Sequence, residues 1–308
     1  MPDFLKLHIV VLLWGLTAVL GNLIHLSATQ VALYRSGLSA LILFVVLRRQ
    51  AALPMPLMAG LLGNGMLLGF HWVLFFLAVK VANVSICMVG MATVSFWTAL
   101  LEPVLVPRCV FQRINLVLGL VVMAAVYVIF RSETQFHSGL LVALGSALLA
   151  SLFSIINGRF SGRIAERTIV MYEMAGAGLF CSLAIIGSDL AGSPLTSPRW
   201  LPTAAEWVSI AILVIACTIY TYLVYVELLR RLSVFTINFA NNLEPVYGIT
   251  LGAIFFGDQQ HVGWGFTVGT AIILLAVIAQ PYLTNEHSIK PAAENDAASA
   301  EHSDPGML

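Results

Sequence analysis

The chain consists largely of long apolar runs separated by short polar segments. Ten runs are long enough for a helix that crosses a bilayer, which takes about 20 mostly apolar residues; they are 7–28, 31–47, 57–79, 84–106, 114–130, 139–156, 169–188, 204–228, 234–256 and 262–283. Apolar residues occupy all sides of these runs, without the alternation of a transmembrane barrel. The pattern therefore predicts an all-α membrane protein with ten transmembrane helices.

Composition supports this prediction. Hydrophobic residues make up 59% of the chain, charged residues 10%, and the mean hydropathy is +0.94. Soluble domains carry about 25% charged residues, so this chain has too little polar material to cover a water-exposed surface. An ordinary soluble enzyme, a nucleic-acid-binding protein and a disordered scaffold are excluded, and the lipid bilayer is an expected partner.

The positions of lysine and arginine predict the orientation. If the N-terminus is cytoplasmic, the inner segments hold eleven of these residues: Lys6, Arg48, Arg49, Arg108, Arg113, Arg159, Arg163, Arg167, Arg230, Arg231 and Lys290. The outer segments hold only Lys80, Arg131 and Arg199. Because cytoplasmic loops are enriched in lysine and arginine, we expect a multi-pass protein of the inner cell membrane with both termini in the cytoplasm.

The chain divides into two halves of five spans each. Residues 1–134 are predicted to form one half and residues 135–283 the other, followed by an acidic tail of low hydrophobicity, 284–308, that is expected to be disordered. The second span of each half opens with a similar element, Tyr34-Arg35 in the first and Tyr172-Glu173 in the second. Five is odd, so the second half crosses the membrane in the opposite sense, as in the inverted repeats of secondary transporters.

A second repeated element is Leu-Glu-Pro-Val, at residues 101–104 and 243–246. Glu102 lies six residues before Arg108 and thus near the inner end of its span, whereas Glu244 lies fourteen residues before Asp258 and close to mid-membrane. The two segments are therefore expected at different depths, and their structural equivalence is left open.

Several short motifs resemble the drug/metabolite transporter superfamily, and within it the ten-helix EamA-type transporters. They are Leu-Leu-Trp14-Gly15, Tyr34-Arg35, the segment from Asn242 to Gly248, and Phe255-Phe-Gly-Asp258 before a glycine-rich last span. The resemblance covers roughly residues 8–282. It implies a solute carrier, often an exporter of amino acids or other small metabolites.

Glu244 is the most informative candidate residue. A charge at the bilayer centre costs at least about 2.5–3.5 kcal/mol and is retained only beside a cavity or a partner. Pro245 follows it directly, and a proline frees a backbone carbonyl one turn back and kinks the helix; Pro103 is the corresponding kink candidate in the first half. Glu244 is expected either to line a cavity, where it binds a substrate amine or a proton, or to hydrogen-bond a neighbouring helix.

Other polar and aromatic side chains within the spans are candidates for solute contact. Asn238, Asn241, Asn242 and Glu244 share one side of the ninth span, which Tyr247 extends, and this side should face protein or water. Arg35 and Glu173 are the other charges within spans. The remaining candidates are Trp14, Tyr34, His71, Tyr172 and Tyr220, for each of which helix packing is the alternative.

These observations favour a secondary transporter that moves a small polar metabolite, an amino acid or a similar molecule, outward by alternating access. The site is expected from spans one, two, three, seven, eight and nine. The alternatives are an uncoupled channel, a membrane-embedded lipid-modifying enzyme, and a carrier of lipids or nucleotide sugars from the same superfamily. No cofactor, metal ion or nucleic acid is expected, and a proton is a candidate coupling ion. The sequence leaves the solute, the direction, the coupling ion and the oligomeric state open.

Overall fold

A computed structural model describes residues 2–48, 52–106, 113–257 and 263–283, and all regular structure in these ranges is helical. Helices of the first half are α1 (Asp3–Leu23), α2 (Ala28–Leu47), α3 (Met55–Val81), α4 (Val84–Met91), α5 (Val94–Leu105) and α6 (Arg113–Ser132). The predicted tail 284–308 and Asp258 lie outside the described residues.

The second half begins after a short turn, η2 (Thr134–Phe136). Its helices are α7 (His137–Phe160), α8 (Glu166–Leu190), α9 (Ala204–Val214), the π-helical turn η3 (Ile215–Tyr220), α10 (Thr221–Leu228), α11 (Val234–Ala240), the 3₁₀ turn η4 (Asn241–Leu243), α12 (Glu244–Phe256) and α13 (Trp264–Leu283).

Eight helical stretches in the described part of the chain are long and apolar enough to cross a membrane. They coincide with the first eight predicted runs, so the prediction of a multi-pass helical membrane protein is confirmed at this level. The ninth and tenth runs correspond to α11–α12 and α13, whose described apolar stretches, Glu244–Phe256 and Trp264–Ala276, are shorter.

Three of the predicted runs are not single regular helices. The fourth is interrupted at Ala92–Thr93 between α4 and α5, the eighth widens into the π-helical turn Ile215–Tyr220, and the ninth is interrupted by Asn241–Leu243. Pro245 follows the last interruption and lies in the first turn of α12. Pro103, in contrast, lies inside α5, which continues to Leu105. The two Leu-Glu-Pro-Val segments therefore occupy different parts of their helices.

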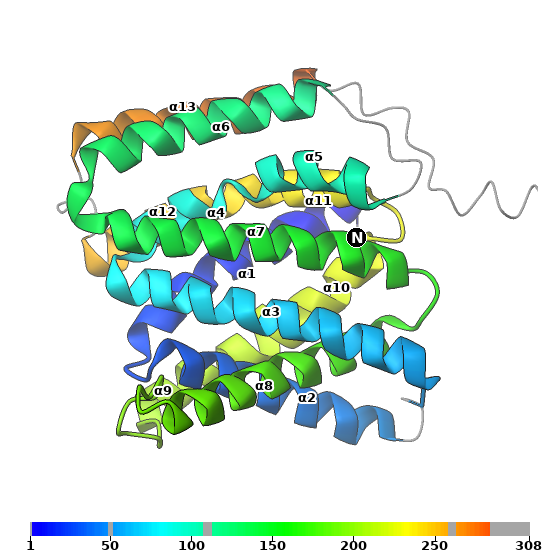
Figure 1. Ribbon diagram of the computed structural model, residues 1–308. Helices are drawn as coiled ribbons and strands as arrows, with labels where there is room; N and C mark the ends of the chain where they lie inside the picture. Colours follow the sequence, from blue (N-terminus) through cyan, green and yellow to red (C-terminus); the bar gives the residue numbers. More distant parts are fainter. Residues whose placement is uncertain (1, 49–51, 107–112, 258–262, 284–308) are drawn as a thin grey trace, which may run out of the picture.

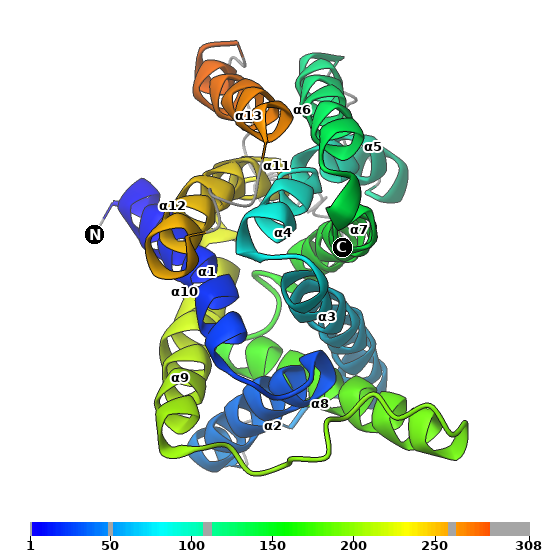
Figure 2. The same cartoon turned by 90° about the vertical axis from the view of Figure 1, so that its left-hand side faces the viewer.

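The helices run side by side in an elongated body (Figure 1). Seen end-on in Figure 2, α6 and α13 form a pair at one extremity, and α2, α8 and α9 lie at the other. The most extensive packing is that of α3 against α7 and α8, followed by α2 against α8 and α6 against α13. Helix α1 packs on α12, and α4 packs on α7 and α12, so helices of the two halves interleave in the centre of the body.

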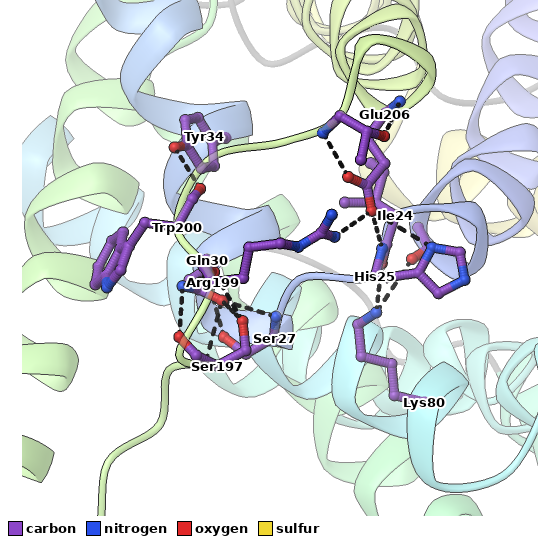
Figure 3. A network of polar contacts seen from close by, with 12 residues as sticks. Ile24, His25, Ser27, Gln30, Tyr34, Lys80, Ser197, Arg199, Trp200 and Glu206 are labelled. Carbon is purple, nitrogen blue, oxygen red and sulfur yellow. Dashed lines mark hydrogen bonds and ion pairs between the residues drawn. The ribbon is translucent and has the colours of Figure 1, made fainter.

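The loop between α8 and α9 is fastened to the corner between α1 and α2 (Figure 3). The side chain of Gln30, which also closes the capping box of α2 with Ser27, donates to the carbonyl oxygens of Ser197 and Arg199 at 3.3 and 3.1 Å. Glu206 accepts hydrogen bonds from the His25 amide at 2.7 Å and from the Arg199 guanidinium at 2.6 Å. We call these contacts the loop clasp; it joins the first half of the chain to the second.

A second set of polar contacts joins the halves at the opposite ends of these helices. The Lys6 ammonium lies 2.7 Å from the Glu227 carboxylate, and Arg231 lies 2.9 Å from Asp3. Both pairs connect α1 with α10 or the turn that follows it. The two halves are thus tied together at both ends of the body.

Candidate functional site

A cavity lies between the two halves, at the level of the three helix interruptions. Its empty volume is about 630 Å³, including space open to solvent. Its polar and aromatic lining comprises Trp14, Thr17, Arg35, His71, Trp72, Ser154, Tyr222, Tyr225, Asn238, Asn241 and Glu244. The lining comes from α1–α5, α7, α10, α11, η4 and α12. The sixth span, α7, thus contributes where the sequence had suggested the seventh, and α8 supplies no lining residue.

Arg35 is held against one wall of the cavity by the π-helical turn. A π-helix bonds residues five apart instead of four, which widens the turn and changes which carbonyl groups are free. The Arg35 guanidinium donates from Nη2 to the Cys217 carbonyl at 2.8 Å and from Nε to the Thr218 hydroxyl at 2.7 Å, and Thr218 in turn donates to the Leu213 carbonyl at 2.6 Å.

The guanidinium also stacks on an aromatic ring. Its Cζ atom lies 4.0 Å from the ring centroid of Trp72, a cation–π arrangement that favours a desolvated cation. Nη1 makes no hydrogen bond to the described residues. Arg35 is therefore fixed by neutral partners, forms no ion pair with a described carboxylate, and has one nitrogen left for a ligand.

Glu244 lies on the cavity directly after the interruption of the ninth span. Its side chain is 8% exposed and makes no hydrogen bond to the described residues. One turn earlier, Oδ1 of Asn241 is buried without a hydrogen-bond partner among those residues. An ionised carboxylate is costly to desolvate without donors, so water or a ligand in the cavity must supply them.

Asn238 lies on the same side of the ninth span, and its side chain is hydrogen-bonded to neighbouring helices. It accepts from the Ser154 hydroxyl at 3.2 Å and donates to the Thr98 hydroxyl at 2.9 Å. These bonds join α11 to α7 and α5. Although Asn238 borders the cavity, its contacts are those of an interhelical tie, which was one of the two interpretations of the asparagine stripe.

His71 presents one ring nitrogen to a neighbouring helix. Its Nδ1 lies 2.8 Å from the hydroxyl and 3.0 Å from the carbonyl oxygen of Ser146, and the same hydroxyl is placed to donate to the His71 carbonyl at 3.0 Å. With both Ser146 oxygens accepting, Nδ1 carries the proton of the neutral ring. Nε2 is then a hydrogen-bond acceptor.

Aromatic rings line the cavity beside the charged groups. Trp14 lies 5.5 Å from both Tyr222 and Tyr225, and Trp72 lies 5.7 Å from Tyr222, as measured between ring centroids. The Trp14 indole donates to the Thr221 hydroxyl at 3.2 Å, which fixes its orientation. The cavity thus combines one cation, one carboxylate and a box of rings that suits an apolar group.

Glu173 lies away from this cavity. It is fully buried and accepts hydrogen bonds from the amide nitrogens of Asn64 at 2.8 Å and Asn157 at 3.2 Å. The Gly65 backbone explains how close these helices come, because a Cβ atom on Gly65 would lie 2.2 Å from the Glu173 carbonyl oxygen. Glu173 therefore belongs to the contact of α3, α7 and α8.

The remaining candidates from the sequence also lie outside the cavity. Tyr34 donates to the Trp200 carbonyl at 2.9 Å and belongs to the loop clasp (Figure 3). Tyr220 is 40% exposed, and Tyr172 borders a separate apolar groove with Leu41 and Phe44. Tyr247 packs near Gly15 of α1. The side chain of Asn242 lies outside the described residues.

Sequence reasoning missed Tyr222 and Tyr225 as lining residues and favoured helix packing for Trp72, which also lines the cavity. Trp72 directly follows His71, and Tyr222 and Tyr225 are three residues apart, so they share one face of α10. The sequence emphasised Tyr220 instead.

Comparisons with known proteins agree with the fold and the motifs. Residues 137–279 match the EamA-like transporter family. Seventeen chains of solved structures match as well; one, described only as "Crystal structure of protein", has a TM-score of 0.64 and 16% sequence identity over 92% of this chain and 98% of its own. That similarity shows the fold alone. No curated protein matches the chain. The family match covers the second half of the chain, which is thus similar to EamA-like transporters.

Proposed function

We propose that this membrane protein is a secondary transporter that exports a small zwitterionic metabolite, such as an amino acid, by alternating access. The observation that carries the proposal is the pair of opposite charges on one cavity, Arg35 and Glu244. Arg35 retains a free nitrogen and Glu244 has no donor among the described residues. A carboxylate and an ammonium group on one solute would satisfy both.

The packing of the halves supports alternating access. In our proposal, residues 1–134 and 135–283 are inverted five-helix repeats in the inner cell membrane, with both termini and the acidic tail 284–308 in the cytoplasm. Equal-numbered spans of the two halves pack on each other: α2 on α8, α4 on α12 and α6 on α13. A pseudo-two-fold axis in the membrane plane would produce such pairs, and transporters of this type bind solute between the repeats.

The other functions considered have less support. A nucleotide sugar would need several cationic groups, whereas Arg35 is the single arginine or lysine on the lining of the cavity. A lipid-modifying enzyme would need clustered acids, histidines or cysteines, and the described residues contain no group of three that could hold a metal ion. An uncoupled channel would give steady flux without counter-transport, which the experiment below detects.

The test compares metabolites released by cells that overproduce the wild-type chain, Glu244→Gln or Glu102→Gln. Glu102 is the matched control because it has the same Leu-Glu-Pro-Val context but does not line the cavity. We expect one or a few zwitterionic metabolites to be released by the wild type and Glu102→Gln, and at least about tenfold less by Glu244→Gln, since a charge-assisted hydrogen bond contributes about 1.5–3 kcal/mol. Equal release from all three would contradict the proposal.

Purified protein in liposomes separates a carrier from a channel. The released metabolite is loaded at high concentration inside the vesicles, and a labelled trace is added outside. A carrier accumulates the label transiently by exchange, whereas a channel lets the gradient decay without accumulation. The second result would overturn alternating access.

A further inference from the structure

The contact between α3, α7 and α8 contains a polar cluster that the solute cavity does not use. It consists of Glu173, Asn64 and Asn157, which are all buried. Each Glu173 oxygen accepts one amide N–H, at 2.8 and 3.2 Å. The amide oxygens of Asn64 and Asn157 have no hydrogen-bond partner among the described residues. Each asparagine therefore retains an amide oxygen that is free to accept a hydrogen bond.

We propose that Glu173, Asn64 and Asn157 form a proton-binding site that is separate from the solute cavity and couples solute export to proton entry. The proposal rests on the transport function proposed above. Binding is a simple protonation: the carboxylate takes up one proton from water and becomes a neutral carboxylic acid.

The two asparagines can satisfy Glu173 in both protonation states. An amide offers N–H donors on one side and a carbonyl acceptor on the other. When Glu173 is ionised, both amides present N–H groups, as observed. When it is protonated, rotation of one amide lets its oxygen accept the new O–H bond. A partner set that serves both states keeps the difference in their free energies small, which reversible proton binding requires.

The neighbouring groups favour a proton over a metal cation. The amide nitrogens of Asn64 and Asn157 point at the carboxylate oxygens and occupy the positions that a cation would need. Tyr222 and Tyr225 of α10 are the further titratable groups that interact electrostatically with Glu173. His71 lies seven residues beyond Asn64, about 10 Å along α3, and Arg35 of α2 is engaged by η3. Among the described residues, no cation forms an ion pair with Glu173.

The cluster lies at a close contact between helices of the two halves. A Cβ atom on Gly65 would lie 2.2 Å from the Glu173 carbonyl oxygen, and one on Gly176 would lie 2.2 Å from that of Leu62. Helix α3 belongs to the first half and α8 to the second. A change in the hydrogen bonds at Glu173 therefore alters the contact between α3 and α8, which must shift when the two halves move relative to each other.

A short connection leads from the cluster to the cavity. Asn64 Nδ2 lies 3.5 Å from the Phe153 carbonyl oxygen, and the Phe153 ring lines the cavity, with its centroid 6.0 Å from that of Tyr222. An amide that rotates on protonation of Glu173 therefore changes a contact of a cavity residue. This contact provides a direct structural path that couples proton binding at Glu173 to solute binding in the cavity.

Infrared difference spectroscopy tests proton binding without a solute. Spectra of purified full-length protein in acidic and alkaline buffer are compared for the wild type, Glu173→Gln and Glu244→Gln. Among the overlapping carboxylic-acid bands of the 15 Asp and Glu residues, we expect one component to be lost in Glu173→Gln and retained in Glu244→Gln. In Asn64→Leu the band should shift in frequency because the acid loses a hydrogen-bond partner. A band unaffected by either change at the cluster would overturn the proposal.

Liposomes test the coupling. The vesicles are loaded with an equimolar mixture of amino acids at neutral pH and diluted into neutral or acidic buffer. Acidic buffer should accelerate wild-type efflux severalfold and leave the Glu173→Gln rate unchanged. Wild-type efflux that ignores external pH, or a Glu173→Gln variant that still responds to it, contradicts the coupling. Absence of any efflux contradicts the transport function instead, and the infrared band still decides whether Glu173 binds a proton.

Discussion

Glu173 and Glu244 are both carboxylates buried in the helical body, yet their surroundings differ. Glu173 is enclosed by three helices and receives two amide hydrogen bonds. Glu244 lies on a cavity at the start of α12, beside an interrupted helix and without a donor among the described residues. The first carboxylate is solvated by protein, and the second depends on whatever occupies the cavity. The free-energy cost of burying a charge is thus offset by fixed amide donors at Glu173 and by the contents of the cavity at Glu244. The first arrangement suits a proton site, and the second suits a solute site.

The largest expected effect concerns the tight packing on the Glu173 side. Gly65→Ala places a methyl group 2.2 Å from the Glu173 carbonyl oxygen, a clash with backbone that only a shift of α3 or α8 relieves. Gly63→Ala, on the same helix, meets nothing within 4 Å. We expect Gly65→Ala to lower thermal stability in detergent strongly, by about 1–3 kcal/mol or more, and Gly63→Ala to leave it unchanged. Equal melting curves for the two variants would show that this contact is loose.

The next largest effect concerns the cavity side. Arg35→Gln removes its cation, and loss of a charge-assisted hydrogen bond of about 1.5–3 kcal/mol should weaken solute binding about 10- to 100-fold. The measurement is solute affinity of the purified protein by calorimetry, using the metabolite found in the release experiment. Arg131→Gln, at the exposed end of α6, is the control and should bind normally. Normal solute affinity in Arg35→Gln would show that the cavity does not bind the solute through Arg35.

A smaller effect on solute affinity is expected from Thr218, which contacts Arg35 and does not line the cavity. Thr218→Val deprives Arg35 Nε of its acceptor at 2.7 Å, and a buried donor left without a partner costs about 1–3 kcal/mol. Arg35 should then be held less firmly, so that solute affinity falls severalfold while the charge is retained. Thr218→Ser keeps the hydroxyl and should restore affinity. If serine and valine behave alike, the hydroxyl does not position Arg35.

The sequence predicted the membrane-spanning character because run length and composition are local properties. It also identified Arg35, His71, Asn241 and Glu244 as candidates, since polar groups inside apolar runs are conspicuous. It did not predict the partners of Glu173, because Asn64 and Asn157 are distant in the chain and meet only through packing. Nor did it predict the π-helical turn, as residues 215–220 contain neither glycine nor proline.

The π-helical turn also sets which side of the eighth span faces inward after it. A π-turn holds about one residue more than an α-turn, and each residue of an α-helix advances by about 100°. Continued at a constant 3.6 residues per turn from Glu206, the inward positions would reach Tyr220. The extra residue rotates all later positions around the helix axis. Tyr220 is therefore 40% exposed, whereas Tyr222 and Tyr225 are 5% and 1% exposed. One span thereby points Glu206 at the loop clasp and two tyrosines at the cavity, which a helix of uniform pitch would not do.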